Sequence, residues 1–303
     1  NIESDRNRYS LAIKYDNPND QKFIDYSKIQ IFAQTIDVED DSERDYTYYP
    51  GGPSGISYSK VHDYSYENDS YGGEIELKSN INSGNKDHNL TYGLEYNKED
   101  SKRVKTTNSS GTITTVKDSP DNEIDRFGIY LQDEINFDNW DLIAGVRYDS
   151  YDLKVTSDSE YTSNGDNVDT PVGSSENSIS PKLAALYKVN PQLTAYAQYA
   201  RGFRAPANEE INNSYSKEAH GYIIYSAPNL KPEKSNNFEV GLKGSYEKND
   251  YNLLVFYNTY EDYIEPYKEI GSYQASNGYG GFTDVLEYKT SNIGSAEIYG
   301  AEL

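Results

Sequence analysis

One histidine lies in the middle of a long polar segment that has a proline motif at each end. His220 lies between Phe203-Arg204-Ala205-Pro206 and Pro228-Asn229-Leu230, and the chain has only 3 histidines. Strand-like sequence flanks the segment on both sides, from Leu193 to Ala200 and from Phe238 to Tyr246. An imidazole in such a loop can bind a metal-containing ligand, or it can be one solvated polar residue among many. Spacing alone favours the solvated residue, so the hypothesis that the loop presents His220 to a ligand depends on the rest of the chain.

The other two histidines fit structural positions better. His62 lies between Tyr58 and Tyr66 in a segment predicted to be a long loop, and His88 lies at a predicted short turn on the opposite side. Of the two, His62 is the better candidate for an outside contact. The sequence has no Gly-x-Ser-x-Gly elbow, no phosphate loop and no His-Glu-x-x-His motif. It therefore predicts a protein that is not an enzyme.

A run of acidic residues is the one candidate for a bound metal ion. Carboxylates can hold calcium, but no 12-residue calcium-loop pattern is present. A solvated acidic loop is therefore favoured over a calcium site for these residues: Asp37, Glu39, Asp40, Asp41, Glu43 and Asp45.

The composition excludes several classes of protein. The chain of 303 residues has no cysteine, no methionine, 32 tyrosines and a formal net charge of -22 at pH 7. Without cysteine there is no disulfide framework and no thiolate metal site, and the acidic balance argues against nucleic acid, whose phosphates need a basic surface. No run of about 20 apolar residues predicts a transmembrane helix, but the ~10-residue alternating strands of a membrane β-barrel escape that test. Since the chain begins at Asn1 without a signal peptide, we expect it to be a piece of a longer protein.

Apolar and polar residues alternate along many segments. For example, Phe127, Ile129 and Leu131 alternate with polar or small neighbours, and the same period of two recurs at residues 9–15, 90–97, 142–149 and 238–246. No convincing helical period is present. Alternation with a period of two predicts strands with one apolar and one polar face, and therefore an all-β fold.

The predicted connections alternate between short and long. Short ones lie near residues 17–25, 82–87, 138–139, 190–191 and 248–249, and long ones span 37–71, 98–125, 154–177, 203–234 and 263–283. This alternation is typical of a transmembrane antiparallel β-barrel, whereas a soluble β-sandwich does not usually lengthen every second loop. We expect about 12 strands of ~10 residues each. Tyrosines at strand ends fit the aromatic girdles at the two membrane surfaces: Tyr9, Tyr15, Tyr148, Tyr151, Tyr246 and Tyr251.

Several segments have the form of known receptor strands and loop ends. They are Phe127-Gly128-Ile129-Tyr130-Leu131-Gln132-Asp133-Glu134, Leu142-Ile143-Ala144-Gly145-Val146-Arg147-Tyr148-Asp149, Tyr196 to Pro206, Asn229-Leu230-Lys231-Pro232-Glu233 and Asn292 to Leu303. Together they resemble the TonB-dependent outer-membrane receptors, in particular the haem and haemoglobin receptor branch. The likeness spans nearly the whole chain and is firmest over residues 125–303.

The resemblance implies a 22-stranded barrel in the outer membrane of a Gram-negative bacterium, with long extracellular loops and short periplasmic turns. In this family an N-terminal plug fills the barrel and contacts the TonB complex. We expect residues 1–303 to be a partial barrel domain in contact with outer-membrane lipid, from which the plug and the C-terminal strands are absent. The strand-like run at residues 296–303 fits this expectation, because an open sheet edge in lipid leaves backbone groups unpaired.

The resemblance also implies a transported ligand, which is haem taken up free or from a haemoprotein. In the haem branch, a histidine between the two loop motifs contacts haem iron, and His220 matches that position in order along the chain. Imidazole is a common axial ligand of haem iron. Tyr215, Tyr222 and Tyr225 would supply aromatic contacts, and Arg204 or Lys217 could reach a haem carboxylate, although Arg204 could instead anchor the base of the loop. Alternatives are a ferric-siderophore receptor, a passive porin and a soluble β-rich adhesin.

Overall fold

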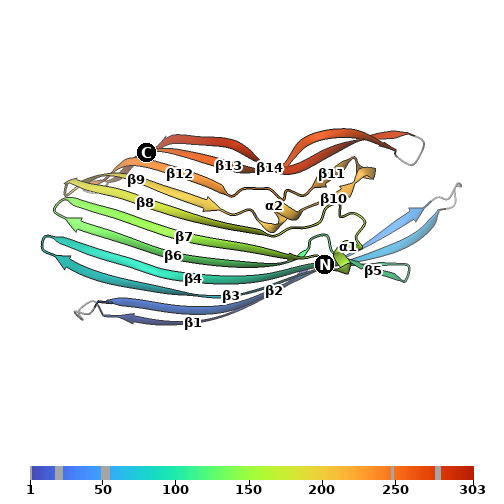
Figure 1. Cartoon of the computed structure of the whole chain (residues 1–303), viewed down its shortest axis with the longest axis horizontal. Helices are drawn as coiled ribbons and strands as arrows, with labels where there is room; N and C mark the ends of the chain where they lie inside the picture. Colours follow the sequence, from blue (N-terminus) through green and yellow to red (C-terminus); the bar gives the residue numbers. More distant parts are fainter. Residues whose placement is uncertain (1, 18–22, 49–54, 247–248, 277–280) are drawn as a thin grey trace.

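The computed structural model describes residues 2–17, 23–48, 55–246, 249–276 and 281–303. They form one 14-stranded sheet with very little helix (Figure 1). The strands are β1 (Ile2–Asp16), β2 (Tyr26–Tyr48), β3 (Ile56–Ser83), β4 (Lys86–Ser109), β5 (Thr112–Val116), β6 (Asp121–Phe137), β7 (Trp140–Thr156), β8 (Ser174–Asn190), β9 (Leu193–Arg204), β10 (Tyr215–Lys217), β11 (Tyr222–Tyr225), β12 (Glu233–Tyr246), β13 (Asn249–Ser276) and β14 (Phe282–Glu302). The helices are α1 (Ser159–Thr162), α2 (Asn208–Asn212) and the 3-10 turn η1 (Glu218–His220).

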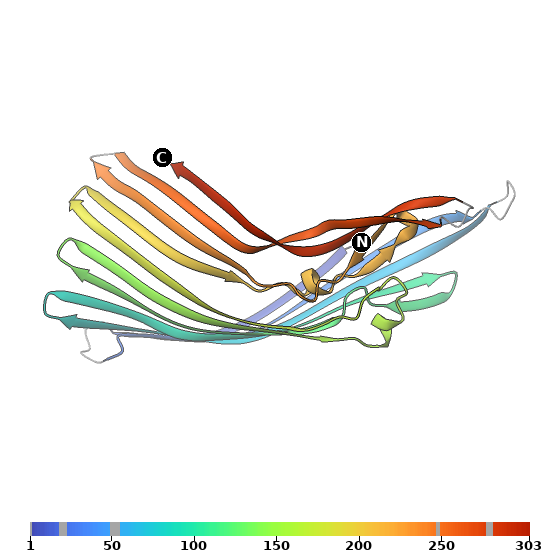
Figure 2. The same ribbon diagram turned by 45° about the horizontal axis from the view of Figure 1, so that its top comes forward.

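The long strands follow one another up and down across the sheet. Their order is β1-β2-β3-β4-β6-β7-β8-β9-β12-β13-β14, after which β11 and β10 complete the edge and β5 pairs with β4. Successive long strands pair antiparallel, and β11 pairs with β14 in parallel. Figure 2 shows that the sheet is strongly curved into a trough. This arrangement confirms the predicted all-β antiparallel fold.

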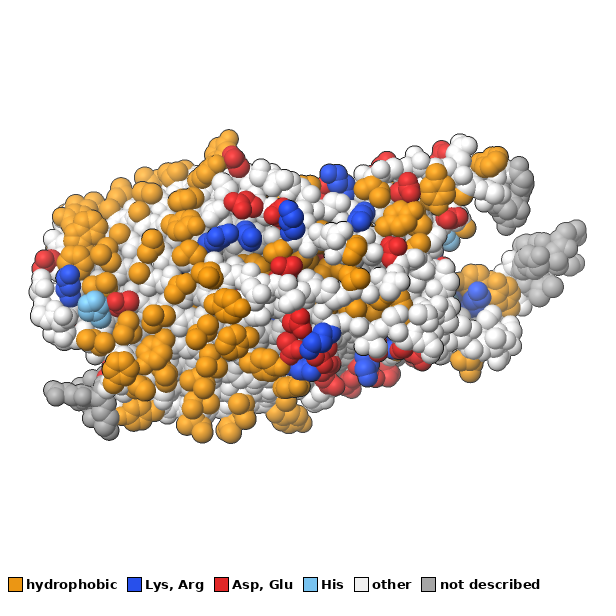
Figure 3. Space-filling model, in the orientation of Figure 1, with side chains coloured by type: hydrophobic (Ala, Val, Ile, Leu, Met, Phe, Trp, Pro, Cys, Tyr) orange, Lys and Arg blue, Asp and Glu red, His pale blue; other side chains and the backbone are white. Residues whose placement is uncertain are grey.

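The outer face of the sheet has an apolar belt. Side chains at every second position are exposed on successive strands, for example Leu11, Ile31, Leu131, Val146 and Val240. Figure 3 shows apolar side chains gathered over the half of the molecule that contains the short turns. A band of this kind matches the lipid-facing surface of a transmembrane barrel. No helix of the described residues has the length and apolar character that crossing a membrane requires.

The inner face is polar, and charged side chains form salt bridges on it. Arg147 forms salt bridges with Glu95 and Asp149, and Arg126 forms one with Glu99 at 2.9 Å. A side chain on Gly128 would meet the Arg147 guanidinium, so this arginine would have to shift if another residue replaced the glycine. These charges line a cavity of about 1000 Å³ on the inner side of the sheet.

A small hydrophobic core lies at the long-loop end, above the belt. Ile211, Ala227 and Leu230 come from the segment after β9, and they pack on residues of β6, β7 and β13: Ile124, Tyr151, Leu153 and Ile264. The segment after β9 is therefore packed onto the sheet at a fixed place. Tyr151 was predicted to lie in a membrane girdle, but it is buried in this core, whereas Tyr9, Tyr148 and Tyr246 are exposed.

The predicted strand length and three of the predicted loops are wrong. Pairing of β2 with β3 continues from Tyr26 opposite Lys78 to Tyr48 opposite Ile56, so most of residues 37–71 is strand. Large parts of 98–125 and 263–283 are also strand. Both faces of these extensions have mostly polar residues. The alternation of apolar and polar residues therefore ends there, although the backbone pairing continues. The predicted turns at 17–25 and 248–249 lie partly outside the described residues.

The small core predicts a clear difference between two isoleucine substitutions. Ile211→Ala should lower the free energy of unfolding by about 2–5 kcal/mol, because it leaves a cavity among buried side chains. Ile113→Ala in β5 removes the same group from a side chain that is 67 % exposed, and it should cost well under about 1 kcal/mol. Denaturant titration in detergent micelles, followed by circular dichroism, measures both. Equal losses would show that the segment after β9 is not packed as described.

Candidate ligand-binding site

The Phe-Arg-Ala-Pro motif fixes the start of the segment that contains His220. Arg204 Nε donates to Glu233 at 2.5 Å, and its Nη1 donates to Glu210 at 2.8 Å, so one guanidinium joins β9, α2 and β12. The hydrogen bond from Arg204 lowers the pKa of Glu233, and the same bond raises the pKa of Arg204. Pro206 is fully buried. This arginine anchors the base of the loop.

The Pro-Asn-Leu motif fixes the other end. Pro228 and Asn229 form a turn that is closed by the Leu230 amide, which donates to the Ala227 carbonyl at 3.2 Å. Leu230 then enters the core. Both motifs are therefore structural supports, and neither places a ligand contact by itself.

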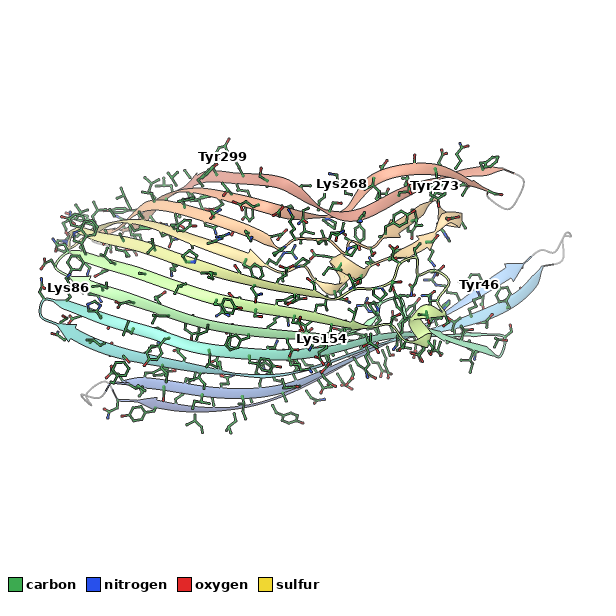
Figure 4. The ribbon with its side chains drawn as sticks, in the orientation of Figure 1. Tyr46, Lys86, Lys154, Lys268, Tyr273 and Tyr299 are labelled. Carbon is green, nitrogen blue, oxygen red and sulfur yellow. The ribbon has the colours of Figure 1, made fainter. Side chains whose placement is uncertain are left out.

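Between the two supports the chain forms a short hairpin with His220 at its tip. β10 and β11 pair antiparallel, from Lys217 opposite Tyr222 to Tyr215 opposite Ile224, and η1 joins them. Gly221 ends η1 with a φ of 82°, which favours glycine. The tip is held because Tyr273 Oη donates to Glu218 at 2.8 Å and β11 adds to the edge of β14. His220 is exposed there, and Figure 4 shows Tyr273 on the adjoining β13.

The structure brings together only some of the residues predicted to contact a ligand. The rings of Tyr215 and Tyr222 meet edge to face, with centroids 6.0 Å apart. Tyr225 instead donates its hydroxyl to Glu287 at 3.0 Å. Burial raises the pKa of both Tyr215 and Tyr225, so these phenols stay protonated at neutral pH. The predicted haem contacts of His220 and the tyrosines remain predictions.

A cavity of about 320 Å³ opens beside this hairpin, at the long-loop end. Lys217 lines it but forms a salt bridge with Asp166, so its charge is already neutralised. Arg103 and Lys105 of β4 also line it. The remaining lining residues are Asp118, Ser119, Glu209, Asn213, Tyr215 and Tyr267. The lining thus combines three cations (Arg103, Lys105 and Lys217), three acids (Asp118, Asp166 and Glu209) and two tyrosines, so it is a polar cavity without an excess of either charge.

Tyr267 is a site residue that the sequence analysis missed. It lies in β13 at a register shift between Glu265 and Lys268, and its φ of 53° is unusual for a tyrosine. Bulges redirect side chains, and here the phenol lines the cavity and accepts a hydrogen bond from Asn213 at 3.0 Å. Pro266 was the available signal, because a proline inside a strand is confined to edges and bulges. The segment had instead been predicted as a loop.

The other predicted sites lie apart from this cavity. His62 is on β3, where its Nδ1 lies 3.0 Å from the Thr107 hydroxyl, and burial, with nearby Lys105 and Lys60, lowers its pKa. His88 lies 2.8 Å from Asp133 near the short-turn end. In the part of the chain that the structure describes, no three His, Cys, Asp or Glu side chains form a group that could hold a metal ion.

Comparison with known proteins adds to this geometry. A family model described as "TonB dependent receptor-like, beta-barrel" matches residues 1–303. The chain is 31% identical over 130 residues to the hemoglobin-haptoglobin utilization protein B of Neisseria meningitidis, which covers 42% of this chain and 16% of that protein. It is 23% identical over 273 residues to the TonB-dependent heme receptor A of Haemophilus influenzae, covering 84% and 35%. The chain thus spans well under half of these relatives.

Two solved structures show the same fold at low identity. The Serratia marcescens hemophore receptor HasR, solved with its hemophore HasA and heme, aligns with 98% of this chain and 51% of its own, with a TM-score of 0.62 and 16% identity. BauA, the ferric preacinetobactin receptor of Acinetobacter baumannii, aligns with 99% and 42%, with a TM-score of 0.55 and 15% identity. These two receptors have different ligands, so the fold alone does not select one.

The anchoring of the loop base predicts a pH-dependent local stability. Arg204→Ala should lower the free energy of opening of residues 205–232 by roughly 1–2 kcal/mol, because Arg204 is partly exposed and its ion pairs are screened. Because the pKa of Glu233 is depressed, this stabilisation is present above the ordinary glutamate pKa and is lost as pH falls through the folded-state pKa. Native-state hydrogen exchange at pH 7 and near pH 4 measures it.

The control is Lys231→Ala on the same segment, where the side chain is 70% exposed and 3.8 Å from Asp262. This change should leave the protection of residues 205–232 nearly unchanged. If Arg204→Ala and Lys231→Ala had the same effect, or if protection did not weaken on acidification, the anchoring role of Arg204 would be wrong.

Proposed function

This chain belongs to the TonB-dependent receptor-like β-barrel family, and we propose that it is the barrel of a receptor that takes up haem, free or from a haemoprotein, to acquire iron. Membership confirms the predicted transmembrane barrel and its place in the outer membrane of Gram-negative bacteria. In this proposal the whole protein is a transporter and not an enzyme. The TonB complex is the partner that the family implies for energy supply.

The observation that carries the proposal is the position of His220. It is exposed at the tip of a hairpin that is bonded to β13 and β14, at the end where the extracellular loops lie. A histidine on a fixed support can bind haem iron without the cost of ordering a flexible loop. Relatives named as a hemoglobin-haptoglobin utilization protein and as a heme receptor support this choice of ligand.

The remaining predicted residues have two different roles in the proposal. Tyr215 and Tyr222 lie behind the hairpin tip and supply aromatic surface for the haem face. Arg204 is occupied by Glu210 and Glu233, and Tyr225 by Glu287, so these two hold the loop in place and do not reach the ligand. Arg204, Pro206 and Leu230 thus act on His220 indirectly.

A ferric-siderophore receptor is the second candidate. It is favoured by the cavity of about 320 Å³, which has cations and tyrosines but not His220 among its lining residues. An iron chelate could bind there through Arg103, Lys105 and the tyrosines without a histidine ligand.

Replacement of His220 distinguishes the two functions. In the full-length receptor, His220→Ala should weaken haem binding by about tenfold or more, since an axial ligand is lost, and should shift the Soret band. Growth with haem as the sole iron source should fall, while uptake of ferric siderophores should be unaffected. The matched control is His88→Ala at the short-turn end. A Soret band and a haem affinity that match those of the unaltered receptor would remove His220 from the mechanism.

A further inference from the structure

The extensions of β2, β3 and β4 form an arm whose two faces differ in charge. The arm comprises residues 37–48, 56–69 and 100–109, and Figure 4 shows Tyr46 on it. Because alternate residues of a strand face opposite sides, the register separates its side chains into two sets. The outer face has nine acids: Asp37, Glu39, Asp41, Glu43, Asp45, Asp63, Glu67, Asp69 and Asp100. On the inner face Asp40 is the only acid of these residues.

The inner face is instead basic and aromatic. We call it the basic strip, which consists of Arg44, Tyr46, Tyr58, Lys60, His62, Tyr64, Tyr66, Arg103 and Lys105. Contacts across the strands place these residues on one side: Tyr46 stacks on Tyr58, and His62 bonds to Thr107. The side is the inner one, because Tyr66 lines the large inner cavity and Arg103 lines the smaller one.

Three of the four Lys and Arg side chains of the strip contact tyrosine rings and not carboxylates. Lys60 lies 5.3 Å from the Tyr46 ring centroid, Arg103 lies 5.5 Å from that of Tyr66, and Lys105 lies 5.4 Å from that of Tyr64. Within the described ranges, no salt bridge joins any of these three cations to an acid. Burial lowers the pKa of His62, and the nearby charges of Lys105, Lys60 and Arg44 lower it further. The shift is therefore in keeping with a positive potential at this surface.

Such cations are unexpected in so acidic a chain. The net charge is -22, and basic side chains near the arm pair with acids: Lys98 with Glu123, Lys117 with Asp121 and Lys154 with Glu123. The acids on the outer face of the same strands are separated from the strip by the sheet. Asp118, Asp166 and Glu209 share a cavity with Arg103 and Lys105, but no salt bridge joins them to these two cations within the described residues. Cations without a carboxylate partner are available to a ligand from outside.

We propose that the basic strip docks an acidic surface of a partner protein. The strip from Tyr58 to Tyr66 spans ~27 Å along β3 and three strands in width, which exceeds any small iron chelate. Tyrosine and arginine are the residue types enriched where proteins bind each other. At Arg103 and Lys105 the strip joins the cavity of Tyr215 and Tyr267, so a protein bound there lies next to the candidate ligand site.

This inference rests on the proposed function for what the partner delivers, namely the haem of a haemoprotein. Binding of an acidic protein surface to the basic strip does not depend on which iron compound the receptor transports. The two ideas can therefore be tested in the same preparation with separate readouts.

The test uses the full-length receptor in detergent micelles and labelled poly-L-glutamate of about 50 residues as the acidic polypeptide probe. Fluorescence anisotropy at about 50 mM and 300 mM salt should show binding that weakens with salt. The triple variant Lys60→Glu, Arg103→Glu, Lys105→Glu should bind about tenfold or more weakly, because opposite charge then repels the probe. Circular dichroism checks that each variant folds.

The matched control compares substitutions of two lysines on the same strand, β4. Lys105→Glu changes the inner face and should weaken binding severalfold, whereas Lys102→Glu changes the outer face three residues away and should leave it within about twofold. Equal effects of these two substitutions would overturn the proposal, as would absence of poly-L-glutamate binding at low salt.

Two further outcomes would also overturn it. Tighter binding of a heparin fragment than of poly-L-glutamate would make the strip a polysaccharide surface, and a parallel loss of free-haem affinity in the triple variant would make it a small-ligand subsite. Failure of the receptor to bind haem, with binding to poly-L-glutamate intact, would contradict the proposed function but support the docking surface.

Discussion

Backbone pairing between neighbouring strands is the constraint on which the rest of this structure depends. A strand in lipid has no water to satisfy its amides and carbonyls, so each must pair with the next strand. The successive antiparallel ladders from β1 to β14 meet that requirement along the described sheet. Once the ladder is fixed, alternate side chains must face lipid or the interior. The apolar belt outside and the ion pairs of Arg147 and Arg126 inside are direct consequences.

The same ladder supports the functional end of the molecule. The strands do not stop at the end of the belt, and the segment after β9 is packed on their extensions through Ile211, Leu230 and the ion pairs of Arg204. The hairpin with His220 is also attached by strand pairing, since β11 adds in parallel to the edge of β14. A loop of this length would ordinarily be mobile. Here each part of it has a neighbour that limits its movement.

The sequence predicted the strands correctly where one face of the sheet meets lipid and the other meets water. Between Phe127 and Leu131 one face meets lipid and the other meets water, so residue types alternate and the strand is visible. Beyond the belt both faces are polar, and the pairing of Asp37–Tyr48 with Ile56–Glu67 has no apolar signature, although charge and aromatic type still alternate there. Tyr151 was misplaced because tyrosine suits both a membrane girdle and a core. The cavity needed contacts between β4, β10 and β13, which no local pattern encodes.

Total charge was a poor guide to what the long-loop end can bind. A net charge of -22 excludes a generally basic surface and argues against nucleic acid as a partner. This net charge is a sum over the two faces of the sheet, however. The sheet separates the acids of the outer face from the cations of the inner face. On β4, Lys102 and Arg103 are adjacent in sequence yet face opposite sides, one among the acids and the other among tyrosines. The potential that a ligand meets is therefore set by strand parity, and the acidic outer face leaves the cations of the inner face free to act.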